Sequence, residues 1–284
     1  MFEVPEGAGI AAVSGIEALK AGLAPAGLNL AGIVARAEWD AHAPPARRCD
    51  ALLPGARAIV VIGNGGGSLW NAFVSDLAEN PQHLCDEPDP LDAFVRRAVA
   101  RADAALGAVP RRWFYAAATE TMHLDFRMLG WLAGLGARSR LGLLLHPVFG
   151  PWVGLRAACF VDAPWHSHRA SVPDPCTDCP APCVTSCPGA AFPGGQWSVD
   201  RCAGFKSATD TCRASCAARE ACPVGAGHRY PDLAIAYHNH RASGRGMLAD
   251  AVGIAAGADR FPGDGPHWND WRARIDVRGK TGGT

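Results

Sequence analysis

The sequence predicts a protein of the α/β class, more narrowly α+β, in which a core built on a mixed sheet is interrupted by a small cysteine-rich module. Two observations predict this arrangement. Short apolar runs that are typical of buried strands alternate with segments of helical periodicity over most of the chain. Eight of the eleven cysteines, in contrast, lie between Cys176 and Cys222, in under one-fifth of the 284 residues. We therefore expect a discontinuous core of residues 1–171 and 231–284 around a module of residues 172–230.

The elements of the core are predicted from local patterns. Strands are expected where apolar residues form short runs or alternate, and helices where they recur every three or four positions. Asp89-Pro90 is a signal for the start of a helix, and Gly107 is a signal for its end. The expected strands are Leu28–Val34, Ala58–Ile62, Trp113–Ala118, Gly142–His146 and Trp152–Val161. The expected helices are Ile10–Leu23, Pro90–Leu106, Leu124–Leu135 and Pro231–Ser243, the last ending at Gly244.

Two features of the strands bear on ligand binding. The glycine run Gly63–Ser68 lacks the third glycine of the dinucleotide fingerprint, because serine occupies the sixth position. It still lets either a ligand edge or another loop approach the backbone closely. Arg156 needs a partner to offset its desolvation, either a carboxylate of this protein or an anionic ligand. Its expected neighbours on one strand face are apolar: Trp152, Gly154, Ala158 and Phe160.

The cysteine segment predicts iron–sulfur chemistry. It begins Cys-x2-Cys-x3-Cys-x3-Cys-Pro, a spacing that resembles that of two-cluster ferredoxins. In such proteins closely spaced cysteines hold one [4Fe–4S] cluster, while the cysteine before proline holds the other. We therefore expect one cluster on Cys176, Cys179, Cys183 and Cys222, and a second on Cys187, Cys202, Cys212 and Cys216.

Two other uses of these cysteines remain open. Structural zinc prefers paired Cys-x2-Cys knuckles, and only Cys176 with Cys179 has this spacing. A disulfide framework needs an oxidising compartment and usually an even number of cysteines, whereas this chain has eleven and no secretory signal. Both alternatives match the sequence less well than two clusters.

Composition narrows the class of partner. Lys plus Arg and Asp plus Glu number 27 each, so no global basic field favours nucleic acid. No apolar run of about 18 residues is free of Gly, Pro, Asn or charge, so no membrane span is expected. The sequence thus predicts a cytoplasmic protein with no membrane partner.

Scattered motifs outside the module resemble the cobalamin-processing CblC (MMACHC) family. The longest is His146-Pro-Val-Phe-Gly-Pro-Trp-Val-Gly-Leu-Arg156. The others follow in the family's order and cover most of the core: Leu53-Pro-Gly55, Asp89-Pro-Leu-Asp92, His123 and His267-Trp-Asn-Asp-Trp271.

The cysteine segment itself resembles that of epoxyqueuosine reductase, a cobalamin-dependent enzyme that joins a nitroreductase-like core to a two-cluster ferredoxin module. Leu53-Pro-Gly-Ala-Arg57 and Ala133-Gly-Leu-Gly136 resemble that family too. Counting from the second motif, its catalytic aspartate corresponds to Glu120. Glutamate is longer than the aspartate of that family, and the chain ends before any helical repeat of the kind that family carries for tRNA. Both differences disfavour tRNA as a partner without excluding it.

Together the resemblances imply a corrinoid bound on a sheet of nitroreductase or flavin-reductase type. The implied function is a reductase that removes the upper ligand of cobalamin, with electrons from an external donor of the ferredoxin or flavodoxin class and with glutathione as a further partner. An epoxyqueuosine-reductase-like activity and a non-catalytic ferredoxin or corrinoid chaperone are the alternatives. The implied catalytic residues are Glu120, His123 and Arg156, and the implied corrinoid contacts are His146, Phe149, Gly150, Trp152, Trp268 and Trp271.

Overall fold

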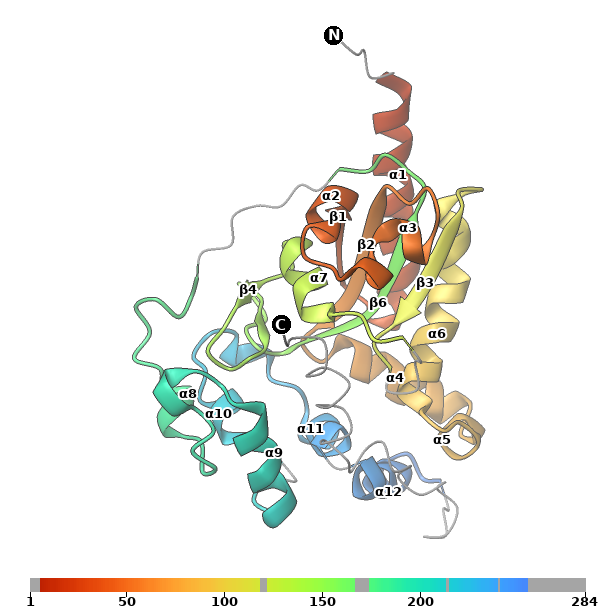
Figure 1. The fold of residues 1–284 in the computed structure, drawn as a ribbon. Helices are drawn as coiled ribbons and strands as arrows, with labels where there is room; N and C mark the ends of the chain where they lie inside the picture. Colours follow the sequence, from red (N-terminus) through yellow and green to blue (C-terminus); the bar gives the residue numbers. More distant parts are fainter. Residues whose placement is uncertain (1–5, 118–121, 167–173, 213–214, 240, 255–284) are drawn as a thin grey trace.

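The structure is a computed structural model that describes residues 6–117, 122–166, 174–212, 215–239 and 241–254 (Figure 1). It contains a four-stranded sheet, a two-stranded hairpin, helices on both faces of the sheet, and a cysteine-rich module that shares an apolar cluster with the hairpin. The strands are β1 (Leu30–Ala35), β2 (Ala58–Gly65), β3 (Arg111–Tyr115), β4 (Ala137–Arg138), β5 (Leu144–Leu145) and β6 (Val153–Val161). The predicted α/β class is confirmed.

The main sheet has the strand order β1-β2-β6-β3, and each of its three pairings is antiparallel. The prediction of a mixed sheet was therefore wrong for the described residues. The physical reason is the position of β6. The helices between β2 and β3 leave these two strands running in the same direction, but the later strand β6 lies between them and pairs antiparallel with both.

A β-bulge in β6 changes which side chains share a face of the sheet with Trp152. The register of β6 against β2 slips at the Ile62–Gly63 step, which leaves Arg156 as an extra residue on β6. Because side chains alternate between the two faces of a strand, one extra residue exchanges the faces beyond it. Ala158 and Phe160 consequently lie in the core on the face opposite Trp152. The prediction that they share its face was wrong.

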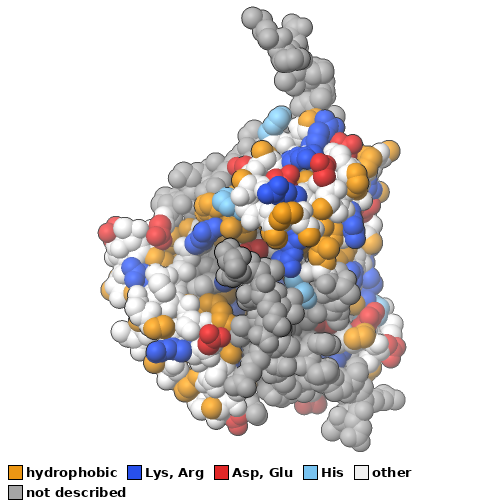
Figure 2. Space-filling model, in the orientation of Figure 1, with side chains coloured by type: hydrophobic (Ala, Val, Ile, Leu, Met, Phe, Trp, Pro, Cys, Tyr) orange, Lys and Arg blue, Asp and Glu red, His pale blue; other side chains and the backbone are white. Residues whose placement is uncertain are grey.

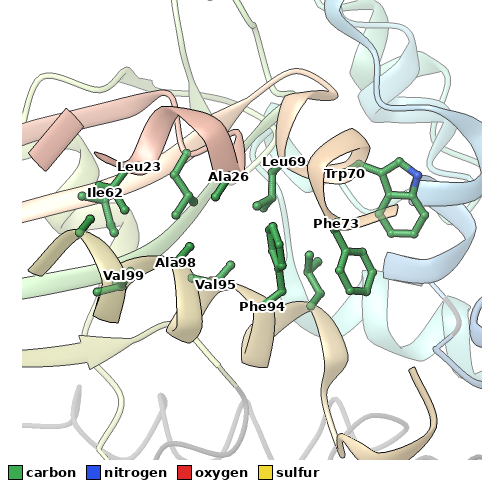
Figure 3. Close-up of a cluster of buried hydrophobic side chains, with 14 of the residues drawn as sticks. Leu23, Ala26, Ile62, Leu69, Trp70, Phe73, Phe94, Val95, Ala98 and Val99 are labelled. Atoms are coloured by element: carbon green, nitrogen blue, oxygen red, sulfur yellow. The ribbon is translucent and has the colours of Figure 1, made fainter. Parts of the chain in front are cut away.

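Helices cover both faces of the sheet. On one face lie α1 (Glu6–Leu23), α4 (Ser68–Glu79), α5 (Gln82–Asp86) and α6 (Pro90–Ala102). Figure 3 shows side chains of α4 and α6 meeting there, with Phe73 5.8 Å from Phe94 between ring centroids. On the other face lie α2 (Arg36–Asp40), α3 (Cys49–Leu52) and α7 (Phe126–Leu132). Short 3-10 turns cover residues 24–26, 45–47, 103–106, 193–195 and 226–228.

The cysteine-rich module lies beside the core at the lower left of Figure 1. It contains α8 (Pro182–Thr185), α9 (Val199–Ala208) and α10 (Ala217–Glu220). Its small apolar cluster includes Leu141 and Leu145, which belong to the hairpin of β4 and β5. The core therefore extends a hairpin into the interior of the module.

The chain then returns to the core through α11 (Asp232–Asn239) and α12 (Arg241–Ala251). The prediction that one helix ends at Gly244 was wrong, because α12 continues through it. A Cβ at Gly244 would lie 2.4 Å from the Cα of Tyr237. This glycine thus allows α11 and α12 to approach closely. Within the described residues, no helix is both long and apolar enough to span a bilayer.

Candidate functional site

The module brings the eight predicted ligands together in two groups of four. Cys176, Cys179, Cys183 and Cys222 line a small cavity of about 20 Å³. Cys187, Cys202, Cys212 and Cys216 line a second cavity of about 270 Å³. The groups have the same members as those expected from the spacing. Four thiols that line one cavity are a donor set suited to a cubane cluster.

The thiols of each group influence one another. Burial raises the pKa of Cys183 and of Cys222, and the neighbouring thiols of the first group raise it further. Burial likewise raises the pKa of Cys202 and Cys212 in the second group. A metal centre has to displace the protons of these thiols, so its binding becomes more favourable as the pH rises.

No three or more His, Cys, Asp or Glu side chains in the described part of the chain form a site for a single metal ion. A cubane differs from a single ion because its thiolates bind the corners of a cage and surround a volume. The remaining cysteines, Cys49, Cys85 and Cys159, line neither thiol cavity. Burial raises the pKa of Cys49 to about 12, so this thiol stays protonated at neutral pH.

The hairpin segment 139–143 separates three spaces. One is an open hollow of about 400 Å³ between α7, the hairpin and Gln196 of the module. Ser139 lines this hollow and the first thiol cavity, Leu143 lines the hollow and the second, and Leu141 lines both thiol cavities. A molecule in the hollow would therefore be separated from either thiol cavity by only a few side chains.

The hairpin also contacts the module through Trp197. A Cβ at Gly142, which has φ +68°, would lie 2.3 Å from the Trp197 ring. The Trp197 side chain in turn lowers the pKa of Cys202 against the larger effect of burial, so it favours the thiolate of that cysteine. Hydrogen bonds to cluster sulfurs are among the factors that set reduction potentials.

The turn between β5 and β6 holds four of the predicted corrinoid contacts and packs against the module. Nδ1 of His146 accepts hydrogen bonds from the backbone N–H groups of Val148 (3.1 Å) and Phe149 (3.2 Å). Burial lowers the pKa of His146, and the nearby His228 lowers it further. The Phe149 ring lies 4.9 Å from each of these two imidazole rings, measured between centroids.

Glycines allow this close packing. A Cβ at Gly65 would lie 2.1 Å from the Phe149 ring, so the glycine run accommodates another part of the same chain at that point. Gly150 has φ +56°, and a Cβ there would lie 1.8 Å from the carbonyl oxygen of Val224 in the module. The turn and the module thus touch backbone to backbone.

Trp152 is enclosed at this interface. It is 2% exposed, and its ring lies 5.6 Å from that of Tyr230, measured between centroids. Arg219, three residues after Cys216, places its guanidinium carbon 4.5 Å from the centroid of Trp152 and 5.0 Å from that of Tyr230. Its Nε and Nη2 donate hydrogen bonds of 3.2 and 2.7 Å to the carbonyl oxygen of Pro151.

Arg156 has a partner within the protein that is neither of the two expected kinds. Its Nε donates a 2.9 Å hydrogen bond to Oδ1 of Asn64, which is 2% exposed. Nδ2 of Asn64 donates in turn to the Tyr230 hydroxyl at 3.5 Å. The bulge in β6 and the end of β2 thus build a polar network at the base of the interface.

The other predicted site residues are not brought together in the described structure. His123 is half-buried, two residues before Asp125, whose side chain caps the start of α7. Glu120, Trp268 and Trp271 lie outside the described residues. Of the predicted corrinoid contacts in the described part of the chain, His146, Phe149, Gly150 and Trp152, none lines the 400 Å³ hollow, so their role as a common pocket stays a prediction.

Three of the arginines that could form a basic face for tRNA, Arg96, Arg97 and Arg111, have internal partners. Arg97 pairs with Asp76 at 3.2 Å and with Glu87 at 3.3 Å. Arg111 pairs with Asp103 at 2.6 Å, and Arg96 lies over the Tyr115 ring. On the face shown in Figure 2, Lys and Arg side chains are interspersed with Asp and Glu.

Sequence reasoning missed Trp197, Arg219 and Tyr230. Arg219 and Trp197 lie within five residues of predicted cluster ligands, so short distance along the chain was the available signal. Tyr230 had no such signal, because its partner Trp152 is 78 residues away in the sequence.

Several solved structures resemble this one, among them the three that follow. An epoxyqueuosine reductase superposes with a TM-score of 0.56 at 17% identity, over 93% of this chain and 81% of that chain. Epoxyqueuosine reductase from Streptococcus thermophilus gives 0.53 at 13% identity, over 94% and 86%. The C. elegans B12-trafficking protein CblC gives 0.57 at 12% identity, over 86% and 97%. This chain shares their fold. No protein-family model and no curated protein matches it in sequence.

Proposed function

We propose that this protein is an iron–sulfur-dependent, cobalamin-processing reductase that removes the upper ligand of the corrinoid. The observation that carries the proposal is the pair of four-cysteine cavities in a module that packs against a core of this fold. The motifs that resemble CblC and epoxyqueuosine reductase support a corrinoid as the molecule that receives the electrons. The electrons would come from an external low-potential donor of the ferredoxin or flavodoxin class.

The cysteines would hold two [4Fe–4S] clusters, in the two groups given above. When bound, such clusters supply single electrons at potentials between about −700 and +450 mV. The hairpin segment 139–143 would position the hollow next to both cavities, and the module's apolar cluster would exclude water from the cysteines. We assign Glu120 the role of proton donor. The pocket residues would be His123, Arg156, His146, Phe149, Gly150, Trp152, Trp268 and Trp271.

The proposed reaction balances with one electron and one proton. In reductive decyanation cobalt goes from Co(III) to Co(II), the cobalt–carbon bond breaks, and cyanide leaves with the electron pair of that bond and takes up a proton. Dealkylation instead transfers the alkyl group to a thiolate, such as that of glutathione, and leaves cobalt as Co(I). Decyanation is the simpler expectation, because a single-electron donor suffices for it.

Anaerobic purification, an iron count and titration with cyanocobalamin test the proposal. We expect about eight irons per chain, since each of two cubanes contains four. Under a one-electron reductant, catalytic amounts of protein should convert cyanocobalamin to the cob(II)alamin spectrum and release cyanide. Stoichiometric binding without turnover would indicate a corrinoid chaperone instead, and zinc in place of iron would remove the redox argument.

Single cysteine variants make the test specific. Cys183→Ser and Cys202→Ser should each lower the iron content by about half, because each removes a ligand from one cubane. Cys85→Ser is the matched control: this half-buried cysteine lies in α5, outside the module, and its loss should leave the iron count unchanged. Equal iron loss in all three variants would contradict the assignment.

The fold shared with epoxyqueuosine reductase supports a second candidate, a reduction of tRNA or a small organic substrate on bound corrinoid. The internal pairing of Arg97 and Arg111 disfavours tRNA. A tRNA-binding assay at several salt concentrations distinguishes the two, since binding through phosphates weakens steeply as salt rises.

A further inference from the structure

Arg219 carries a positive charge from the module into the interface with the core. It lies on α10, three residues after Cys216, and lines the second thiol cavity together with all four cysteines of that group. Its guanidinium then reaches the aromatic rings of Trp152 and Tyr230 and the carbonyl oxygen of Pro151. One side chain thus borders both the cavity and the core.

This charge has no carboxylate partner among the described residues. The ion pairs found in that part of the chain join other basic residues, including the exposed Arg229 of the same module with Glu220. Burial lowers the pKa of Arg219, an effect that Tyr230 and the Cys216 thiol partly offset. A largely buried guanidinium without a counter-ion is costly, because neither one carbonyl nor aromatic rings replace its hydration fully.

We propose that Arg219 is the counter-ion of the centre held by Cys187, Cys202, Cys212 and Cys216, and that its charge raises the midpoint potential of that centre alone. The inference rests on the proposed function, because it requires an iron–sulfur cluster in the second cavity. A cubane held by four thiolates is a net anion, so it would supply the negative charge that no carboxylate of the described residues gives Arg219. Arg219 belongs to the electrostatic environment of the cluster and is not one of its ligands.

The sign of the effect follows from the charges. Reduction adds one electron and makes the cluster more negative, so a nearby cation stabilises the reduced form more than the oxidised form. The first cavity, lined by Cys176, Cys179, Cys183 and Cys222, does not include Arg219. One of the two clusters should therefore respond to a change at Arg219, and the other serves as a control within the same molecule.

Redox titration of the full-length, iron-loaded protein, followed by EPR and visible absorbance, tests the proposal. In Arg219→Gln we expect one midpoint potential to fall while the other stays at the wild-type value. Arg219→Lys keeps the charge and should leave both near wild type. Arg229→Gln, which removes an exposed and paired charge in the same module, should shift neither. Arg219→Met keeps an apolar stem against Trp152 and Tyr230 and tests the same point if the Gln variant does not fold.

The outcomes separate this inference from the proposed function. Two unchanged midpoint potentials in Arg219→Gln or Arg219→Met would overturn the counter-ion role and leave the clusters in place. An equal shift in Arg219→Lys would also overturn it, since packing rather than charge would then be responsible. A wild-type protein without iron would overturn both proposals.

Discussion

Gly150→Ala should loosen the contact between the core and the module more than any ordinary glycine-to-alanine change. Gly150 has φ +56°, and a Cβ there would lie 1.8 Å from the carbonyl oxygen of Val224 and 2.6 Å from its carbonyl carbon. Both atoms belong to backbone, so no flexible side chain can move aside. The facing Gly225, with φ +69°, approaches the carbonyl carbon of Phe149 in the same way.

Two effects determine how much Gly150→Ala lowers the free energy of unfolding. An alanine held in the left-handed region costs about 1–2 kcal/mol. Overpacking that forces the backbone to shift adds about 1–3 kcal/mol. Gly194→Ala is the matched control, because Gly194 also has positive φ (+62°) and lies in the module, yet a Cβ there meets nothing within 4 Å. Gly194→Ala should lose only the free energy of unfolding that corresponds to an alanine in the left-handed region.

The assay is thermal unfolding of the iron-loaded protein at a fixed scan rate, with cyanide release measured alongside. For a chain of this size each kcal/mol lowers the melting temperature by about 2–4 °C, so Gly150→Ala should melt about 2–12 °C below Gly194→Ala. Its iron content should stay at the wild-type value while cyanide release slows. Equal melting temperatures for the two variants would refute the backbone contact between Gly150 and Val224.

Three further predictions concern single contacts. Arg156→Met should lower the free energy of unfolding in urea by about 1–3 kcal/mol, because the buried Asn64 carbonyl loses its donor; no change would show that this hydrogen bond is absent. The folded-state pKa of His146 is lowered, so wild-type stability should be complete above about pH 6.5 and fall as the pH drops towards that pKa. His146→Asn keeps an acceptor that does not titrate, and its urea midpoint should fall less between pH 7.5 and pH 5.5 than that of wild type. Gly244→Ala should cost about 1–3 kcal/mol in the same urea assay through its contact with Tyr237, whereas Gly246→Ala, also on α12 but with open space at its Cβ, should not.

The sequence predicted the local elements well where side-chain periodicity was clear. A short apolar run placed the start of β2, apolar alternation placed β6 close to its observed bounds, and Asp89-Pro90 placed the start of α6. The cysteine pattern, through its resemblance to two-cluster ferredoxins, also predicted which four line each cavity, including Cys222, which lies 39 residues after Cys183.

Other features of the site depend on contacts between distant parts of the chain. The position of β6 between β2 and β3 is a long-range pairing that no local pattern encodes. The bulge at Arg156 appears only once β6 is aligned with β2, and it changes which faces the neighbouring side chains occupy. Gly244 was predicted to end a helix. It lies instead within α12, where the close approach of α11 requires a residue without a side chain.

The sequence by itself therefore determined the class of the fold, most of its strands and the helices α1, α6, α7 and α11, since periodicity acts locally, and the cysteine pattern predicted which four cysteines line each cavity. Only the tertiary structure decided what surrounds those cysteines. Arg219 meets Trp152 and Pro151 across 67 and 68 residues of sequence, and Gly150 meets Val224 across 74. Such contacts set the electrostatic environment of the site because charge and packing act through space. The separation of these residues along the chain does not predict that they meet.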